Sequence, residues 1–115
     1  MPRKPTRKTL KANLDREFSK VVRKLGECER CGNTETLQCA HFISRANLQI
    51  RWDKDNANCF CAGCHFWSHQ RPDGFVEFMQ QKLGEKRYKA LRERSMGAGY
   101  LDLPMMLKEL KQGNL

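Results

Sequence analysis

Two Cys-x-x-Cys pairs constrain what this chain can fold into more than any other feature of the sequence. The four residues are Cys28, Cys31, Cys61 and Cys64. Four thiolates at this spacing suit a tetrahedral Zn²⁺ ion, which closes structural sites in small domains. Gly32 follows the first pair and permits the tight turn that brings its two sulfurs to one ion. We therefore predict a structural zinc site that ties together the two ends of the intervening segment.

The setting of the thiols also favours a metal over disulfides. The chain has 115 residues, enough for one small domain, and contains no apolar run of the roughly 20 residues that cross a membrane. Its basic N-terminus lacks the apolar segment of a secretory signal, so we expect a cytoplasmic protein with no membrane partner and with reduced thiols. Cys39 and Cys59 lie outside the two pairs, and we interpret them as small buried side chains.

The charge distribution indicates a polyanionic partner. The formal net charge is +9, and residues 1–26 hold nine Lys or Arg residues against two acidic ones. A basic segment of this kind suits a nucleic-acid backbone. The alternative interpretation of the charge alone is a solubilising tail.

Hydrophobic periodicity predicts several helices. Apolar residues recur at spacings of three and four from residue 9 onward, and Gly26 is placed to end that helix. Further helices are expected over residues 61–70, 75–83 and 85–94, and after a capping Asp102. Residues 34–43 are expected to form a strand pair or hairpin, and residues 44–58 a polar connection. The fold class is therefore expected to be α+β.

Three segments follow from this pattern. Residues 1–8 are expected to be a flexible basic arm, and residues 9–95 to be one domain with an N-terminal helix. Residues 96–115 are expected to form a C-terminal helix that is a candidate interaction element.

The three histidines and one asparagine form a second series with regular spacing. His41, Asn56, His65 and His69 are separated by 15, 9 and 4 positions. A neutral imidazole can accept a proton near physiological pH, which makes His41 a candidate general base. Two histidines four residues apart lie on one face of a helix, so His65 and His69 could share one metal ion.

This series resembles the His-Asn-His motif of the ββα-metal (HNH) endonuclease superfamily, and the cysteine pairs resemble those of its zinc-bearing branch. The match is closest to the phage NinG/Rap recombination proteins. It rests on Cys-x-x-Cys-Gly, Ala-His-Phe, the segment Ile50-Arg51-Trp52-Asp53-Lys54-Asp55-Asn56, and Cys-x-x-Cys-His, and it covers residues 15–95 approximately.

The resemblance implies a ββα-metal domain with the activity of a metal-dependent DNA endonuclease. It implies His41 as general base, Asn56 as the residue that orients it, and His65 and His69 as ligands of Mg²⁺, Mn²⁺ or another divalent metal. It further implies phage DNA recombination in a bacterial cytoplasm, with branched or junction DNA as substrate. A junction is two-fold symmetric, so a resolving enzyme would act as a homodimer.

The sequence leaves several alternatives open. Many family members carry a metal-binding residue just before the base, where this chain has Ala40, and this departure favours a non-catalytic zinc module that binds nucleic acid. A nuclease acting on RNA is a third hypothesis, and Asn58 is an alternative to Asn56. The cations around the motif are candidate nucleic-acid contacts, and they are Arg45, Arg51, Lys54 and Arg71. Trp52 and Trp67 are interpreted as core residues rather than base-stacking ones.

Overall fold

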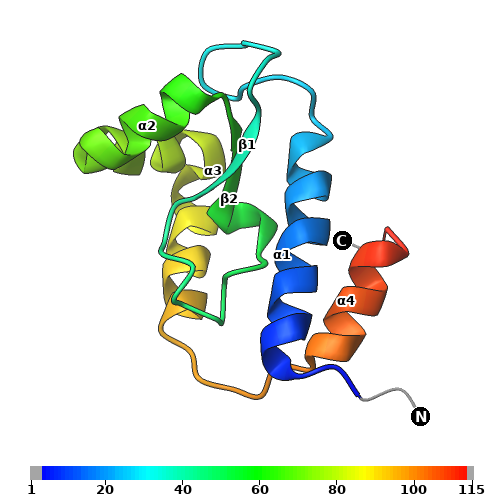
Figure 1. Ribbon diagram of the computed structural model, residues 1–115. Coiled ribbons are helices and arrows are strands. Elements are labelled where there is room, and N and C mark those ends of the chain that lie inside the picture. The colour runs from blue at the N-terminus through cyan, green and yellow to red at the C-terminus, as the bar shows by residue number, and fades with distance from the viewer. Residues whose placement is uncertain (1–3, 114–115) are drawn as a thin grey trace.

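The computed structural model describes residues 4–113 and shows a small α+β protein (Figure 1). Within those residues the chain forms four α-helices, one short 3₁₀ helix and a two-stranded sheet. In chain order the elements are α1 (Arg7–Arg23), β1 (Gln38–His41), η1 (Lys54–Asn56), β2 (Ala57–Phe60), α2 (Ala62–Gln70), α3 (Pro72–Ser95) and α4 (Leu103–Lys111). The expected fold class is therefore confirmed at this level.

The first helix begins earlier than the sequence suggested. Thr6 caps α1 by accepting a hydrogen bond from the backbone N–H of Thr9, so Arg7 and Lys8 are helical rather than part of a flexible arm. Residues 1–3 of the expected arm lie outside the described residues. The helix ends at Arg23, and Gly26 turns the chain away with a positive φ of 81°.

The prediction of a hairpin within residues 34–43 was wrong. Only Gln38–His41 is extended there, and its partner is Ala57–Phe60, whose first two residues fall in the segment 44–58 that we expected to be a polar connection. The two strands are antiparallel, with Cys39 opposite Cys59 and His41 opposite Ala57. Pairing of strands so far apart in sequence depends on the long loop between them, which periodicity does not reveal.

Helices α2 and α3 lie on one side of this sheet and α1 and α4 on the other (Figure 1), and each side has its own hydrophobic cluster. Ala40 and Phe60 face a cluster built with α2 and α3, which also contains the buried Cys28, Cys61 and Cys64. Ala57 belongs to the other cluster, which α1 and α4 form with Trp52. The short sheet thus lies between a cysteine-rich half and a half built mainly from α1 and α4.

Helices α2 and α3 follow each other with only Arg71 between them. The expected helix from residue 61 or 62 to 70 is confirmed, and Pro72 starts α3 at a position where the missing N–H costs nothing. The two helices expected before and after Gly84 form one element with a sharp kink. Gly84 has φ 76° and ψ 166°, a backbone conformation that favours glycine.

The C-terminal helix packs on its own chain. Asp102 caps α4 by accepting a hydrogen bond from Met105 N–H, as predicted. Leu103 and Leu110 of α4 are buried against α1. Across residues 4–113, no helix combines the length and the apolar character needed to cross a membrane.

Candidate functional site

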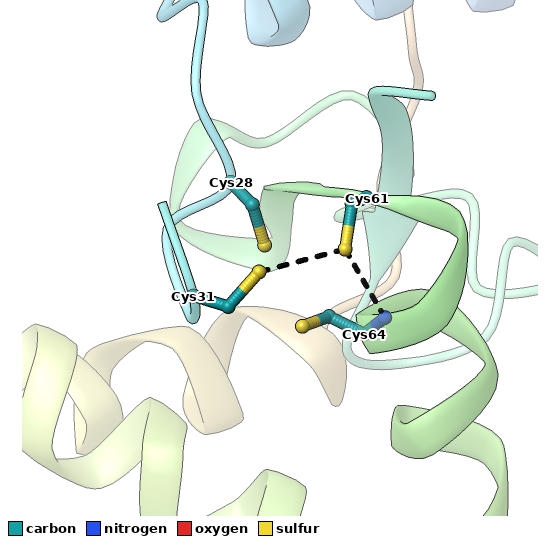
Figure 2. A group of neighbouring side chains, drawn as sticks. All are labelled: Cys28, Cys31, Cys61 and Cys64. Carbon is teal, nitrogen blue, oxygen red and sulfur yellow. Dashed lines mark hydrogen bonds between the residues drawn. The ribbon is translucent and has the colours of Figure 1, made fainter. Parts of the chain in front are cut away.

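The four paired cysteines converge to one point (Figure 2). All four sulfur atoms lie within 4.8 Å of one another, and the Sγ atoms of Cys31 and Cys61 are 3.6 Å apart. Tetrahedral zinc with Zn–S bonds of about 2.3 Å places its sulfurs about 3.8 Å apart. The cluster therefore has the composition and nearly the geometry of a site that could hold a metal ion such as zinc.

Local turns place these sulfurs. The N–H of Gly32 donates to the Cys28 carbonyl at 2.9 Å, and Gly32 adopts a positive φ of 80°, which closes the first turn. Cys61 is the N-cap of α2, and its sulfur accepts a 3.4 Å hydrogen bond from the Cys64 N–H. The first turn is also tied to the sheet, because the backbone N–H of Glu29 donates to the Cys59 carbonyl at 2.8 Å.

The thiols of the cluster differ in acidity. Burial opposes ionisation of Cys28, but backbone hydrogen bonds from Cys61, Cys31 and Arg30 outweigh it and lower its pKa to about 6. Burial raises the pKa of Cys64 to about 12. Without an ion the cluster therefore retains protons, and binding of a metal by four thiolates would release them.

His41 is held in one tautomer. Its Nε2 lies 2.8 Å from the carbonyl oxygen of Arg51, and a carbonyl only accepts hydrogen bonds, so Nε2 carries the proton. The Nδ1 lone pair is then available as a base. The side chain is half-buried, and this burial is the main reason that the pKa of His41 is lowered from its ordinary value.

Asn56 fixes the loop that follows His41. Its side-chain Oδ1 accepts from Ile43 N–H at 2.7 Å, and its Nδ2 donates to the carbonyls of Ile43 and Ile50 at 3.0 and 3.2 Å. Its own carbonyl accepts from Phe42 N–H. The side chain is fully buried, so water could not replace these hydrogen bonds if the amide were removed.

Asn58, the alternative to Asn56, serves a different part of the fold. It is also fully buried, but its Oδ1 accepts from Lys82 at 2.7 Å and its Nδ2 contacts the Ala40 carbonyl at 3.4 Å. Lys82 in turn pairs with Glu29 at 2.8 Å. Asn58 thus links β1 and β2 to α3, and Asn56 is the asparagine that contacts the loop after His41.

His65 and His69 lie together on α2. Their rings are stacked with centroids 5.0 Å apart. His65 Nδ1 is 2.7 Å from Oε1 of Gln38 on β1, and because an amide oxygen only accepts, the His65 proton is on Nδ1 and the Nε2 lone pair is available to a metal. Burial, and next the charge of His69, lower the pKa of His65.

One open groove of about 770 Å³ joins all three histidines. We call this the histidine groove, and its polar lining includes His41, His65 and His69 with Arg45, Ser68 and Arg92. The lining contains no carboxylate. Over residues 4–113, the four cysteines are the one set of three or more His, Cys, Asp or Glu side chains close enough to share an ion. The histidine pair therefore offers two protein ligands.

The position before His41 does not face this groove. Ala40 is fully buried and belongs to the cluster with Phe60 and Met79. The strand alternation that turns His41 outward turns residue 40 into the core. Position 40 therefore contributes no ligand to the groove, and no carboxylate from the other lining residues takes its place.

The four candidate nucleic-acid contacts have different environments. Arg45 lines the histidine groove and pairs with Asp15 at 2.7 Å, with its side chain 59% exposed. Arg51 is only 16% exposed, and its guanidinium is paired with the same carboxylate. Arg71 pairs weakly with Asp73, and Arg71 and Lys54 are not among the residues that line the groove. The contacts of Arg51 favour a role in stabilising the fold over a role in binding nucleic acid.

Asp15 is the centre of that arrangement. Burial would raise its pKa, but hydrogen bonds from Arg51 and Trp52 and the charges of Arg51 and Arg45 lower it overall. Trp52 donates its indole N–H to Asp15 at 2.9 Å and is 4% exposed, which confirms it as a core residue. Arg45 and Arg51 of the loop are thereby anchored to α1.

The prediction of a core or buried position holds for Trp67 and Cys59 but not fully for Cys39, which also lines the histidine groove. Trp67 packs against the core, with the Arg30 guanidinium 3.6 Å from its ring centroid. Cys59 is fully buried, and Cys39 is half-buried with its pKa raised by burial to about 11. Neither belongs to the converging cluster.

Sequence reasoning missed one residue that lines the histidine groove and one that contacts a histidine of the groove. Gln38 contacts His65 from the neighbouring strand, and Arg92 reaches the groove from the far half of α3. Arg92 lies in a helix rich in charged residues, where no motif distinguishes it from its neighbours. Gln38 could have been found only by pairing β1 with α2, a tertiary contact that the sequence does not show.

Comparisons of the chain with family models, with curated proteins and with solved structures found no significant match.

Proposed function

We propose that this chain is a metal-dependent DNA endonuclease of the ββα-metal (HNH) type with a structural zinc ion. The observation that carries the proposal is the arrangement of His41. Its Nε2–H donates a hydrogen bond to the Arg51 carbonyl, so the lone pair of Nδ1 is available to accept a proton. The side chain also lines the same groove as His65 and His69. His41 lies at the end of β1, Asn56 in η1 directly before β2, and His65 and His69 on α2, which is the chain order of the motif that the sequence resembles.

In this proposal His41 Nδ1 accepts the proton of the attacking water. Its lowered pKa keeps the imidazole neutral near pH 7, as a general base requires. Asn56 acts as a positioning residue, because its contacts with Ile43 and Ile50 fix the loop that carries the Arg51 carbonyl. Arg45 and Arg92 provide positive charge to bind the substrate phosphate.

His65 and His69 would hold a divalent ion through their ring nitrogens, with Gln38 fixing the orientation of His65. When bound, such an ion polarises the phosphate and stabilises the leaving oxygen. Two protein ligands leave positions for water and for substrate oxygen, which suits a single-metal site. The four cysteines would hold zinc as a structural ion, since no position in a four-thiolate site is left for substrate.

DNA as substrate is supported by the basic groove lining and by the net charge of +9. The resemblance to phage recombination proteins supports branched DNA and a homodimer as finer parts of the proposal. Because Leu103 and Leu110 of α4 are buried on α1, a dimer contact at this end would use the exposed Met96, Tyr100 and Met105.

A second candidate is a non-catalytic zinc module that binds DNA. One observation favours it: the histidine pair has two ligands, and buried Ala40 cannot add a third. This candidate predicts salt-sensitive DNA binding without metal-dependent cleavage.

Cleavage of supercoiled plasmid and of a synthetic four-way junction tests the proposal. Zinc-loaded wild type would be assayed without added metal and with Mg²⁺, Mn²⁺ or Ni²⁺, beside His41→Ala and a control, Thr34→Ala, in the exposed loop before β1. We expect metal-dependent cleavage that falls at least about 100-fold in His41→Ala and persists in the control. Binding of both DNAs with no cleavage under any metal would overturn the nuclease proposal in favour of the zinc module.

A further inference from the structure

A second groove, of about 340 Å³, adjoins the histidine groove along α1. We call it the α1 groove. It is lined by Asp15, Ser19 and Arg23 of α1 and, across from them, by Gln38, His41 and Arg45. His41 and Arg45 line both grooves, so the two form one depression that passes over the candidate base.

The α1 side of this depression presents one regular row of side chains. Asp15, Ser19 and Arg23 are spaced by four residues, which places them on the same face of the helix. Arg23 is exposed, and its Nε donates to the Ser19 carbonyl at 3.2 Å and to Ser19 Oγ at 3.0 Å. These contacts direct the guanidinium along the helix and leave its two terminal nitrogens for an external acceptor.

The charge of this groove is positive. Asp15 is the acidic residue of this lining, and its single negative charge is shared by the guanidinium groups of both Arg51 and Arg45. Within the described part of the chain, Arg23 has no acidic residue at ion-pair distance. Arg23 and Arg45 therefore leave excess positive charge next to His41.

We propose that the α1 groove binds a backbone phosphate of the DNA substrate next to the one that is cleaved, through the Arg23 guanidinium and the Ser19 hydroxyl. A guanidinium beside a hydroxyl matches the oxygens of a phosphodiester. Ser19 Oγ accepts from Arg23, so its own proton is free to be donated to a phosphate oxygen. This inference rests on the proposed function and adds to it a path for the strand across His41 onto α1.

The salt dependence of DNA binding tests this site. Affinity would be measured from low to high salt in a His41→Ala background, which prevents cleavage, with and without Arg23→Gln. Arg16→Gln is the matched control, because Arg16 is an exposed cation of the same helix that does not line the groove. Circular dichroism would check that each variant keeps its helical content.

Loss of one phosphate contact should reduce the slope of log affinity against log salt by about 0.9 in Arg23→Gln and weaken binding at low salt by roughly tenfold. Arg23→Lys should restore the slope but only part of the affinity, since lysine cannot make the two-pronged contact. Equal slopes for Arg23→Gln and Arg16→Gln would overturn the site. That result would not touch the nuclease proposal, which is judged by metal-dependent cleavage and its loss in His41→Ala.

Discussion

The cysteine cluster and the histidine groove, the two candidate metal centres, differ in how completely the fold assembles them. The cysteine cluster brings four sulfurs from two segments within 4.8 Å of one another, three of them buried. The histidine groove offers His65 and His69 from a single helix and is open to solvent. A closed set of ligands suits an ion that holds the fold together, whereas an incomplete set leaves positions for water and substrate. The comparison therefore supports a structural role for the cysteine cluster, and the incomplete set at the histidine groove is consistent with the catalytic role that we propose for it.

The largest effect is expected at the cysteine cluster. Cys61→Ser should abolish zinc binding and unfold at least the half of the protein around α2 and α3, because structural zinc typically contributes about 10 kcal/mol or more to folding. Zinc content by mass spectrometry and thermal unfolding by circular dichroism measure this. Cys39→Ser is the control, since Cys39 lies outside the cluster. A Cys61→Ser variant that melts like wild type would refute the structural role of the site.

Adding a third metal ligand to the histidine pair by substitution at position 40 should not succeed. Ala40→Asp places a carboxylate in the core beside Phe60 and Met79, and we expect a loss of several kcal/mol in the free energy of unfolding with no gain in metal affinity. Urea unfolding and calorimetric metal titration would measure both, with Thr34→Asp in the exposed preceding loop as control. Tighter metal binding without loss of stability would mean that residue 40 reaches the groove.

Removing the hydrogen bond that orients His65 should have a smaller effect. Gln38→Leu removes the acceptor that orients His65, and we expect Mn²⁺ or Ni²⁺ affinity of the zinc-loaded protein to fall about 10- to 100-fold. Gln38→Glu keeps an acceptor and should retain the affinity. Gln49→Leu serves as the control because Gln49 contacts the Gly99 carbonyl instead. An unchanged affinity in Gln38→Leu would show that the orientation of His65 does not depend on this contact.

The smallest expected effect concerns pH. Burial lowers the pKa of His41 below 6.5, the Arg51 carbonyl opposes this, and the charge of Arg45 adds to it. Because the base must be neutral, kcat/KM at saturating metal should rise with pH through a pKa below 6.5 and be level near pH 7. Arg45→Gln should move this acid limb upward by less than about one unit. A wild-type acid limb above pH 6.5 would contradict the assignment of His41 as base.

The same shift affects stability. The unfolded chain takes up a proton at His41 more readily than the folded protein does, so this residue should lower the free energy of unfolding as the pH falls below 6.5. Urea unfolding at pH 7 and at pH 5.5, in wild type and His41→Gln, isolates this contribution.

Local signals in the sequence predicted the parts of the molecule that local chemistry determines. The Cys-x-x-Cys spacing and Gly32 predicted the converging cluster, and Asp102 and Gly84 predicted a cap and an interruption. The four-residue spacing of His65 and His69 predicted that they lie together, and their stacked rings confirm it. The cap, the interruption and the histidine pair depend on geometry within a few residues, and so does each cysteine pair, while the convergence of the two pairs follows from their shared preference for one ion.

The sequence did not predict the parts that depend on distant segments. Strand β2 was missed because its residues are buried on both faces and lack alternation, with the pattern Ala57-Asn58-Cys59-Phe60. Arg51 was expected to contact nucleic acid, whereas it lies against Asp15, 36 residues earlier. The tautomer of His41 depends on a carbonyl ten residues away, which belongs to a loop shaped by Asn56.

The kink at Gly84 makes this position suited to a mirror-image residue. Its φ of 76° and ψ of 166° are close to the inversion of an extended conformation, so an L-residue would be strained by its backbone although its Cβ would meet no atom within 4 Å. D-Alanine, introduced by chemical ligation, matches these backbone angles and would restrict the unfolded chain. This replacement should therefore raise the free energy of unfolding by about 0.4 to 1 kcal/mol.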